Sequence, residues 1–184
     1  GNTSLPNPST MRIGVTAGGA CVLHQGAMDI GQGANTVISQ IAADALGVPV
    51  HSLSLIDGDT DRTPDCGKTS ASRQTFVSGK AALLAGHALR EVILRHGNVS
   101  DDASIVIDGA EVRLVDNAAG GTASIDLSSL PVNAHGYVFM AEETYDPPTT
   151  PLDENGQGAP YAVYGYGAQM IELMVDIGLG QVRL

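Results

Sequence analysis

Two loops rich in small residues each lead directly into a segment with the apolar spacing of a helix. The first contains Gly31, Gln32 and Gly33, and the second runs Thr69-Ser70-Ala71-Ser72-Arg73-Gln74-Thr75. The first backbone N–H groups of a helix have no partner inside the helix, and they favour anions. The sequence therefore predicts two clusters of free N–H groups, which together suit an anionic ligand with several arms.

Each loop also has a purely structural interpretation. The first fits a tight turn before a helix that Asn35 or Thr36 caps, and the second fits a helix start that Ser70 or Ser72 caps. A cation is unfavourable at a helix N-terminus because the positive end of the helix dipole repels it. Arg73 is therefore better explained if it faces an anion.

Other chemical motifs in the chain are incomplete. Gly67–Ser70 resembles the end of a phosphate-binding P-loop, but the first glycine of that motif would fall at Arg62. Asp57–Asp61 resembles the start of a calcium loop, but the glycine and the final glutamate of such a loop are replaced by Arg62 and Lys68. No cluster has metal-ligand spacing and no nucleophile elbow is present, so we expect no metal ligand and assign no catalytic residue.

Composition narrows the class of protein. The chain has 184 residues, 43% of them hydrophobic, which suffices for one large domain or two small ones. Its net charge of −11 argues against nucleic acid and anionic membranes as partners. Cys21 and Cys66 are far apart and no apolar run is long enough to span a membrane, so we expect a reduced, cytoplasmic protein.

The hydrophobic periodicity predicts an α+β fold with mixed or antiparallel sheets and two main helices. The domain is expected over 11–184, with possible halves 11–98 and 99–184, after a disordered or artificially cut segment 1–10. The expected elements are a hairpin over 11–25, helices over 35–46 and about 72–96, a strand over 52–56, a hairpin over 104–115, a short helix near Leu127 in a connector, and strands over 137–144, 168–176 and 181–184.

The two loops and their surroundings closely resemble one protein family. Gly26–Thr36 and Thr69–Thr75, in this order and spacing, resemble the large molybdenum-binding subunit of the xanthine dehydrogenase/aldehyde oxidase family. Supporting matches are Gln40–Asp44, Leu46–Pro49, Gly58–Thr60 and the C-terminal run that begins at Tyr166-Gly167-Ala168-Gln169 and continues through Glu172, Val175-Asp176, Gly180 and Val182. Either loop alone would be a weak indication of this family, whereas the two loops in this order and spacing are quite specific.

The resemblance implies a molybdopterin-type cofactor, which in bacteria is often the cytosine dinucleotide form. The cofactor-binding residues would be Gly31, Gln32 and Gly33 in the first loop and Thr69, Ser70, Ala71, Ser72, Arg73 and Gln74 in the second. Gln32 would hydrogen-bond the pterin, and the second loop would hold pterin and phosphate. Family members oxidise a small-molecule substrate, an aldehyde or an N-heterocycle, with water as the oxygen source.

Several family features are missing from this chain. The general-base glutamate belongs to a later Gly-Glu segment, the earlier cofactor loops precede this portion, and no iron–sulfur or flavin motif is present. The resemblance therefore implies a part of a molybdenum hydroxylase that is inactive and without cofactor when isolated. Its partners would be the remainder of the molybdenum subunit and iron–sulfur and FAD subunits or domains. The alternatives are a binding or assembly module of the same fold without cofactor, or an unrelated nucleotide-binding enzyme.

Overall fold

The computed structural model describes residues 6–116, 118, 120–164 and 167–184. Both long helices lie in the first 97 residues, and the regular elements of the described residues after them are strands and one short turn of 3₁₀ helix. In chain order the elements are β1 Ser9–Val15, β2 Cys21–Gln25, α1 Ala34–Leu46, the 3₁₀ turn η1 Val50–Ser52, β3 Leu53–Asp57, the π-helical turn η2 Gln74–Ser78, α2 Gly79–Gly97, β4 Ser104–Asp108, β5 Glu111–Asp116, β6 Gly121–Asp126, the 3₁₀ turn η3 Leu127–Ser129, β7 Phe139–Tyr145, β8 Met174–Asp176 and β9 Gln181–Arg183.

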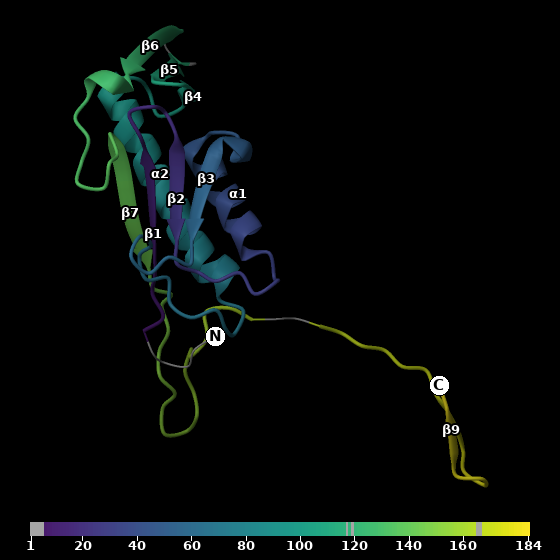
Figure 1. The fold of residues 1–184 in the computed structure, drawn as a ribbon. Helices are drawn as coiled ribbons and strands as arrows, with labels where there is room; N and C mark the ends of the chain where they lie inside the picture. Colours follow the sequence, from purple (N-terminus) through teal and green to yellow (C-terminus); the bar gives the residue numbers. More distant parts are fainter. Residues whose placement is uncertain (1–5, 117, 119, 165–166) are drawn as a thin grey trace.

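The main sheet has the strand order β3-β2-β1-β7, and both long helices pack on one of its faces (Figure 1). β1 pairs antiparallel with β2 and β7, whereas β2 and β3 are parallel. Alternate residues of β1, namely Met11, Ile13 and Val15, are fully buried beneath the helices. A second, antiparallel sheet β4-β5-β6 lies at one end of the molecule. The prediction of an α+β fold with mixed and antiparallel sheets and two main helices is confirmed.

The two helices approach each other closely at a glycine. A Cβ atom added to Gly86 of α2 would lie 2.7 Å from the Cβ of Ala45 and 2.9 Å from the carbonyl oxygen of Ala42, both in α1. α2 is covered by the sheet on one side and by α1 on another, so its buried surface is wider than one stripe. A single helical stripe in the sequence, Val77, Ala81, Leu84, Ala88 and Val92, describes this surface only in part. Val77 and Ala81 are buried and the other three are half-buried, while the fully buried positions continue through Ala85, Leu89 and Ile93.

Most predicted boundaries agree with the structure, and the exceptions have local causes. Gly47 ends α1 with a φ of 84°, as expected of a glycine at a helix C-terminus. The predicted 72–96 helix begins only at Gln74, with a π-helical turn. β6 was not predicted, because Ile125 is the only one of its residues that is fully buried. The short helix near Leu127 is confirmed as a 3₁₀ turn.

The N-terminal boundary and the division into halves need correction. Ser9 and Thr10 belong to β1 and not to a disordered segment 1–10, while residues 1–5 lie outside the described residues. β7 comes from the second predicted half, yet it pairs with β1 along its whole length, from Ser9 opposite Tyr145 to Val15 opposite Phe139. A division at residue 98 therefore does not separate two sheets.

The C-terminal hairpin β8-β9 stands apart from the rest of the molecule (Figure 1). The strand predicted over 168–176 is formed only over Met174–Asp176, and Tyr166 lies outside the described residues. Val175 pairs with Val182, so their exposed side chains share one face of the hairpin, and three further exposed apolar residues lie directly beside the strands. These apolar residues are Leu173, Val175, Ile177, Val182 and Leu184. In the described part of the chain, no helix is both long and apolar enough to cross a membrane.

The close helix contact makes a testable prediction about Gly86. Replacing Gly86 by Val forces α1 and α2 apart, because the new side chain meets backbone and Cβ atoms of α1 that cannot rotate away. We expect the free energy of unfolding to fall by about 1–3 kcal/mol, measured by urea denaturation. His87→Val, at the exposed neighbouring position, serves as the control. Equal stability of the two variants would contradict this packing.

Candidate functional site

The two loops singled out in the sequence meet around one hollow of about 340 Å³. Ile30 and Gln32 line it from the first loop, and the continuous run Thr69–Thr75 lines it from the second. Seven of the nine expected cofactor-binding residues therefore come together, namely Gln32, Thr69, Ser70, Ala71, Ser72, Arg73 and Gln74. Gly31 and Gly33 do not line it and lie in the turn that leads to α1.

A chain of hydrogen bonds connects the main sheet to both loops. The Ser9 hydroxyl donates to Ser78 Oγ at 2.8 Å, and the Ser78 hydroxyl donates to Gln74 Oε1 at 2.5 Å. Gln74 Nε2 donates to Thr69 Oγ1 at 2.7 Å, and the Thr69 hydroxyl donates to the carbonyl oxygen of Met28 at 2.9 Å. Gln74 is thus a buried link between the sheet and the hollow's rim, and Thr69 holds the two loops together.

The start of α1 is already occupied by a carboxylate of the chain itself. Asp29 Oδ1 accepts from Gly31 N at 2.8 Å and from Gly33 N at 3.3 Å, and its Oδ2 accepts from Asn35 N at 3.1 Å. The bonds from Asn35 and Gly31 lower the pKa of Asp29. The expectation of a free N–H cluster here is therefore wrong, as is capping by Asn35 or Thr36, because Gly33 is the N-cap and makes no side-chain cap bond.

Gln32 bonds to its own loop. Its Oε1 accepts from Ile30 N at 2.6 Å and its Nε2 donates to the carbonyl oxygen of Met28 at 3.2 Å. The side chain is exposed at the edge of the hollow. Gly31 and Gly33 have φ values of 97° and 82° with open space beside their Cα atoms, so glycine is needed there for the turn and not for a close contact.

The second loop has an unusual backbone. Ala71 and Ser72 both adopt left-handed conformations, with φ of 57° and 56°, although neither is a glycine. Such residues carry strain and persist only where the surroundings hold them, which occurs most often at functional sites. The helical segment then begins with Arg73 as its N-cap and no side-chain cap bond, so the expected capping by Ser70 or Ser72 is wrong. Ser70, Ala71 and Ser72 are exposed at the hollow.

Arg73 lies in a different position from the one expected. Its side chain is 1% exposed, and its guanidinium donates inward to oxygen atoms of the fold. The acceptors are Asn7 Oδ1 and the carbonyl oxygens of Asn7, Pro8, Cys66 and Lys68. The interpretation that Arg73 faces a bound anion is therefore corrected, because these bonds already use its three nitrogens. Burial lowers the pKa of Arg73, but a guanidinium stays charged in proteins.

The hollow can bind an anion or a polar planar group, and it offers little for proton transfer. Among the described residues that line it there is no carboxylate, histidine or cysteine. The nearby Cys66 thiol is buried; it donates to the Thr10 carbonyl oxygen, and burial raises its pKa, so it is not a nucleophile. Within the described ranges, no three His, Cys, Asp or Glu side chains are grouped so as to hold a metal ion.

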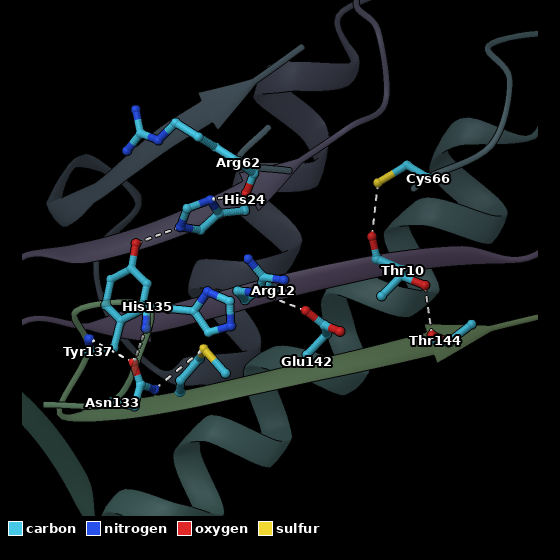
Figure 2. Close-up of polar contacts among 11 residues, drawn as sticks. Thr10, Arg12, His24, Arg62, Cys66, Asn133, His135, Tyr137, Glu142 and Thr144 are labelled. Carbon is cyan, nitrogen blue, oxygen red and sulfur yellow. Dashed lines mark hydrogen bonds and ion pairs between the residues drawn. The ribbon is translucent and has the colours of Figure 1, made fainter. Parts of the chain in front are cut away.

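A second polar cluster lies on the face of the main sheet opposite to the helices (Figure 2). His24 Nδ1 lies 2.9 Å from the carbonyl oxygen of Arg62, and Nε2 lies 2.5 Å from the hydroxyl of Tyr137. A carbonyl only accepts, so Nδ1 carries the proton and Nε2 accepts from Tyr137. Arg12 forms an ion pair with Glu142 at 2.7 Å beside them.

This second cluster is best explained as structural. Burial lowers the pKa of His24 and raises that of Tyr137, so both groups stay neutral. A Cβ on Gly14 would lie 2.5 Å from Tyr137 Cγ, which means that the ring lies directly against the backbone of β1. The pair thus fixes the 130–137 connector to the sheet.

Sequence reasoning missed four residues that support the two loops. Asp29 was not predicted to have a role, although an acidic residue just before a helix is itself a signal for its N-terminus. Ser9 and Ser78 reach the loops through Gln74, and Asn7 reaches them through Arg73. Ser9 is more than 65 residues from Ser78 in sequence, and so is Asn7 from Arg73, so no local pattern reveals these contacts.

Comparison with known proteins agrees with this geometry. A family model described as a molybdopterin cofactor-binding domain matches residues 1–184. The chain belongs to this family. The predicted membership in the molybdenum-binding portion of the xanthine dehydrogenase/aldehyde oxidase family is confirmed.

Individual relatives show how much of the family protein this domain represents. The "Probable hypoxanthine oxidase XdhD" of Escherichia coli K12 is 30% identical over 183 residues, which cover 94% of this chain and 17% of that protein. The xanthine dehydrogenase of Oryza sativa is 24% identical, over 95% of this chain and 11% of its own length. The chain therefore spans less than a fifth of either relative.

Solved structures share the fold of this molybdopterin-binding domain. The aldehyde oxidoreductase from Desulfovibrio desulfuricans aligns with a TM-score of 0.60 at 22% identity, over 88% of this chain and 15% of that one. CO dehydrogenase from Oligotropha carboxidovorans aligns with a TM-score of 0.53 at 23% identity, over 76% of this chain and 18% of that one.

The internal carboxylate at α1 predicts a pH-dependent contribution to stability. Since the folded-state pKa of Asp29 is lowered, its stabilisation is complete above the ordinary aspartate range and is lost as pH falls below about 4. We expect Asp29→Asn to lower the melting temperature at pH 7, with the difference from the parent chain closing at acid pH.

Asp61→Asn removes the same charge from an exposed loop and is the control. Thermal melts of the three proteins from pH 7 to pH 3 measure the effect. A deficit in Asp29→Asn that stays constant over this range would show that the carboxylate's charge does not support the turn.

Proposed function

We propose that this domain holds the pterin and phosphate of a molybdopterin cofactor in the hollow between its two loops, as part of a molybdenum hydroxylase. The meeting of Gln32 with Thr69–Thr75 around one space is the observation that carries the proposal. The lining fits the ligand, since it contains the amide of Gln32 and the hydroxyl-bearing residues Ser70, Ser72 and Thr75, with no carboxylate among the described lining residues. Neutral hydrogen-bond donors suit a phosphate and a polar ring system.

Each part of the site has a separate task in this proposal. When bound, molybdopterin supplies the molybdenum that oxidises an aldehyde or N-heterocycle with water as the oxygen source. Gln32 orients the pterin through its amide, while Ser70 and Ser72 lie where their hydroxyl groups can bind pterin or phosphate. Ala71 leaves the room that a flat ligand needs. The chain's own groups bind and orient, and no residue described here is assigned a proton-transfer step.

We extend the proposal to the cytosine dinucleotide form of the cofactor. A larger hollow of about 740 Å³ adjoins the first and shares Ser72 and Thr75 with it. Phe76, Leu83 and Tyr145 give this second hollow an apolar wall. A ligand that extends beyond the pterin thus has space next to the second loop. Acid release of cytidine monophosphate from the purified enzyme tests this form.

The remaining parts of the enzyme are proposed partners. A two-stranded hairpin is at best marginally stable alone, so the exposed apolar face of β8-β9 fits packing against the remainder of the molybdenum subunit. Iron–sulfur and FAD subunits or domains complete electron transfer in this cytoplasmic enzyme. We expect the isolated chain to be inactive and without cofactor.

One observation favours the alternative of an assembly module without cofactor. The side chains of Gln32 and Asp29 form hydrogen bonds with backbone groups of the first loop, so this loop does not require a ligand to keep its shape. Molybdenum and pterin content of the complete protein distinguishes the two functions, because the assembly module would contain neither.

The space beside Ala71 can be tested by filling it. In the complete enzyme, we expect Ala71→Leu to lower pterin and molybdenum content several-fold, because the larger side chain occupies the hollow. Stability should change little, since Ala71 is exposed and no core packing is disturbed. Metal analysis, pterin fluorescence and thermal melting measure these effects.

Ala71→Gly is the matched control, because glycine accepts the positive φ and adds no bulk. It should retain the cofactor. Normal cofactor content in Ala71→Leu, or loss of cofactor only together with a large fall in melting temperature, would contradict the proposed site.

The amide of Gln32 can be tested separately. Gln32→Ala removes a donor and an acceptor at the edge of the hollow, and we expect weaker cofactor retention that corresponds to roughly 1–3 kcal/mol. Gln32→Glu keeps the acceptor for Ile30 N but adds a negative charge, so it should retain less cofactor than Gln32→Ala. Equal cofactor retention by both variants and the parent during dialysis would make Gln32 a turn residue only.

A further inference from the structure

The guanidinium of Arg73 connects both ends of the second loop to the segment before β1, which lies 65 or more residues from Arg73 in sequence. Nε donates to Asn7 Oδ1 at 2.7 Å, and Nη2 donates to the carbonyl oxygens of Asn7 at 3.1 Å and Pro8 at 2.7 Å, just before β1. Nη1 donates to the carbonyl oxygens of Cys66 at 2.5 Å and Lys68 at 3.1 Å, at the start of the second loop. Arg73 itself stands at the end of that loop, where the π-helical turn begins.

These bonds enclose the strained part of the loop. Lys68 and Arg73 bracket the run that contains Ala71 and Ser72, whose left-handed conformations are unfavourable for residues with a side chain. With Lys68 tied directly to Arg73, the intervening residues have to form a compact turn. Gly67 completes the arrangement: its φ is 67°, and a Cβ there would lie 3.0 Å from both Nη1 and Nη2.

We propose that Arg73 is the positioning residue that keeps the Ser70–Ser72 turn in the shape that receives the cofactor. It acts from behind the hollow, through the backbone, and not by contact with an anion. The inference rests on the proposed function of the hollow. It assigns to a buried arginine the task of preorganising a binding loop, which lowers the ordering cost of binding.

The chemistry of the side chain predicts that lysine cannot replace it. A guanidinium is a rigid planar fork with donors in several directions, whereas an ammonium is a single point with three donors. Lysine at position 73 keeps the positive charge but cannot reach Asn7, Pro8, Cys66 and Lys68 together. Arg73→Lys therefore removes the connection between segments without removing the charge.

Arg90 offers a matched control within the same chain. It also donates to three backbone carbonyl oxygens, that of Leu46 at the end of α1 and those of Asp101 and Ala103 in the loop before β4, but it lines neither hollow. Arg90→Lys should thus cause a comparable loss of stability without affecting the second loop. A difference between the two lysine variants isolates positioning from general stability.

The experiment uses the complete enzyme, purified with and without its cofactor. In the cofactor-free form we expect Arg73→Lys to raise hydrogen exchange of the amides of residues 69–73 by about tenfold or more, as local opening becomes easier. In the cofactor-containing preparation, its pterin and molybdenum content should fall several-fold. Arg90→Lys should change neither readout.

Defined outcomes would overturn the inference. Unchanged exchange at 69–73 in Arg73→Lys, or an equal loss of cofactor in Arg90→Lys, contradicts a positioning role. If Arg73→Lys does not accumulate as folded enzyme, Asn7→Ala decides, because it removes only the Nε acceptor; parent-like exchange and cofactor content in that variant likewise contradict the role.

The Ala71→Leu variant separates this inference from the proposed function. If Ala71→Leu loses cofactor and Arg73→Lys retains it, the hollow is the binding site and the inference about Arg73 fails. If both retain cofactor in full, the proposed function fails together with the inference.

Discussion

A buried positive charge has to be surrounded by oxygen atoms, and the way in which this fold surrounds Arg73 determines the shape of its candidate site. Burying an ion without such partners would cost far more than the net stability of a domain. The segment before β1, the start of the second loop and the beginning of the helical segment must therefore all be in place around one guanidinium. Through Gln74 and Thr69 the same region fixes Met28, so the first loop depends on it as well.

The two loops look alike in sequence but have opposite needs in the structure. At α1 the chain supplies its own anion, and the carboxylate of Asp29 takes the N–H groups of Gly31, Gly33 and Asn35. At the second loop the guanidinium of Arg73 is buried beneath the loop, and small or hydroxyl-bearing residues are exposed at the hollow. The first loop is thus complete in itself and presents a single amide, that of Gln32, whereas the second carries backbone strain that a bound ligand can help to offset.

The extent to which the sequence predicted this arrangement follows from the range of the interactions. α1 was predictable because its apolar spacing and Gly47 are local signals, and the pairing of the two loops followed from their motifs. The start of the second helical segment was not, because a left-handed alanine and serine have no signature in residue type. The position of Arg73 was predicted wrongly for a different reason, which is the long range of its contacts. Its acceptors at Asn7 and Pro8 are brought to it by β1, and the register of β1 is set by pairing with β2 and β7.

The electrostatics of the site agree with this division. The chain carries a net charge of −11, so its overall field repels an anionic ligand. The hollow does not compensate with exposed cations, since among the described residues that line it Arg73 is the only charged one, and it directs its guanidinium into the protein. Attraction then has to come from hydroxyl, amide and backbone dipoles, which act over short distances and depend on direction. Such a site selects a ligand by shape and hydrogen-bonding pattern more than by charge, and for that reason the precise backbone of the Ser70–Ser72 turn matters more than the number of positive residues near it.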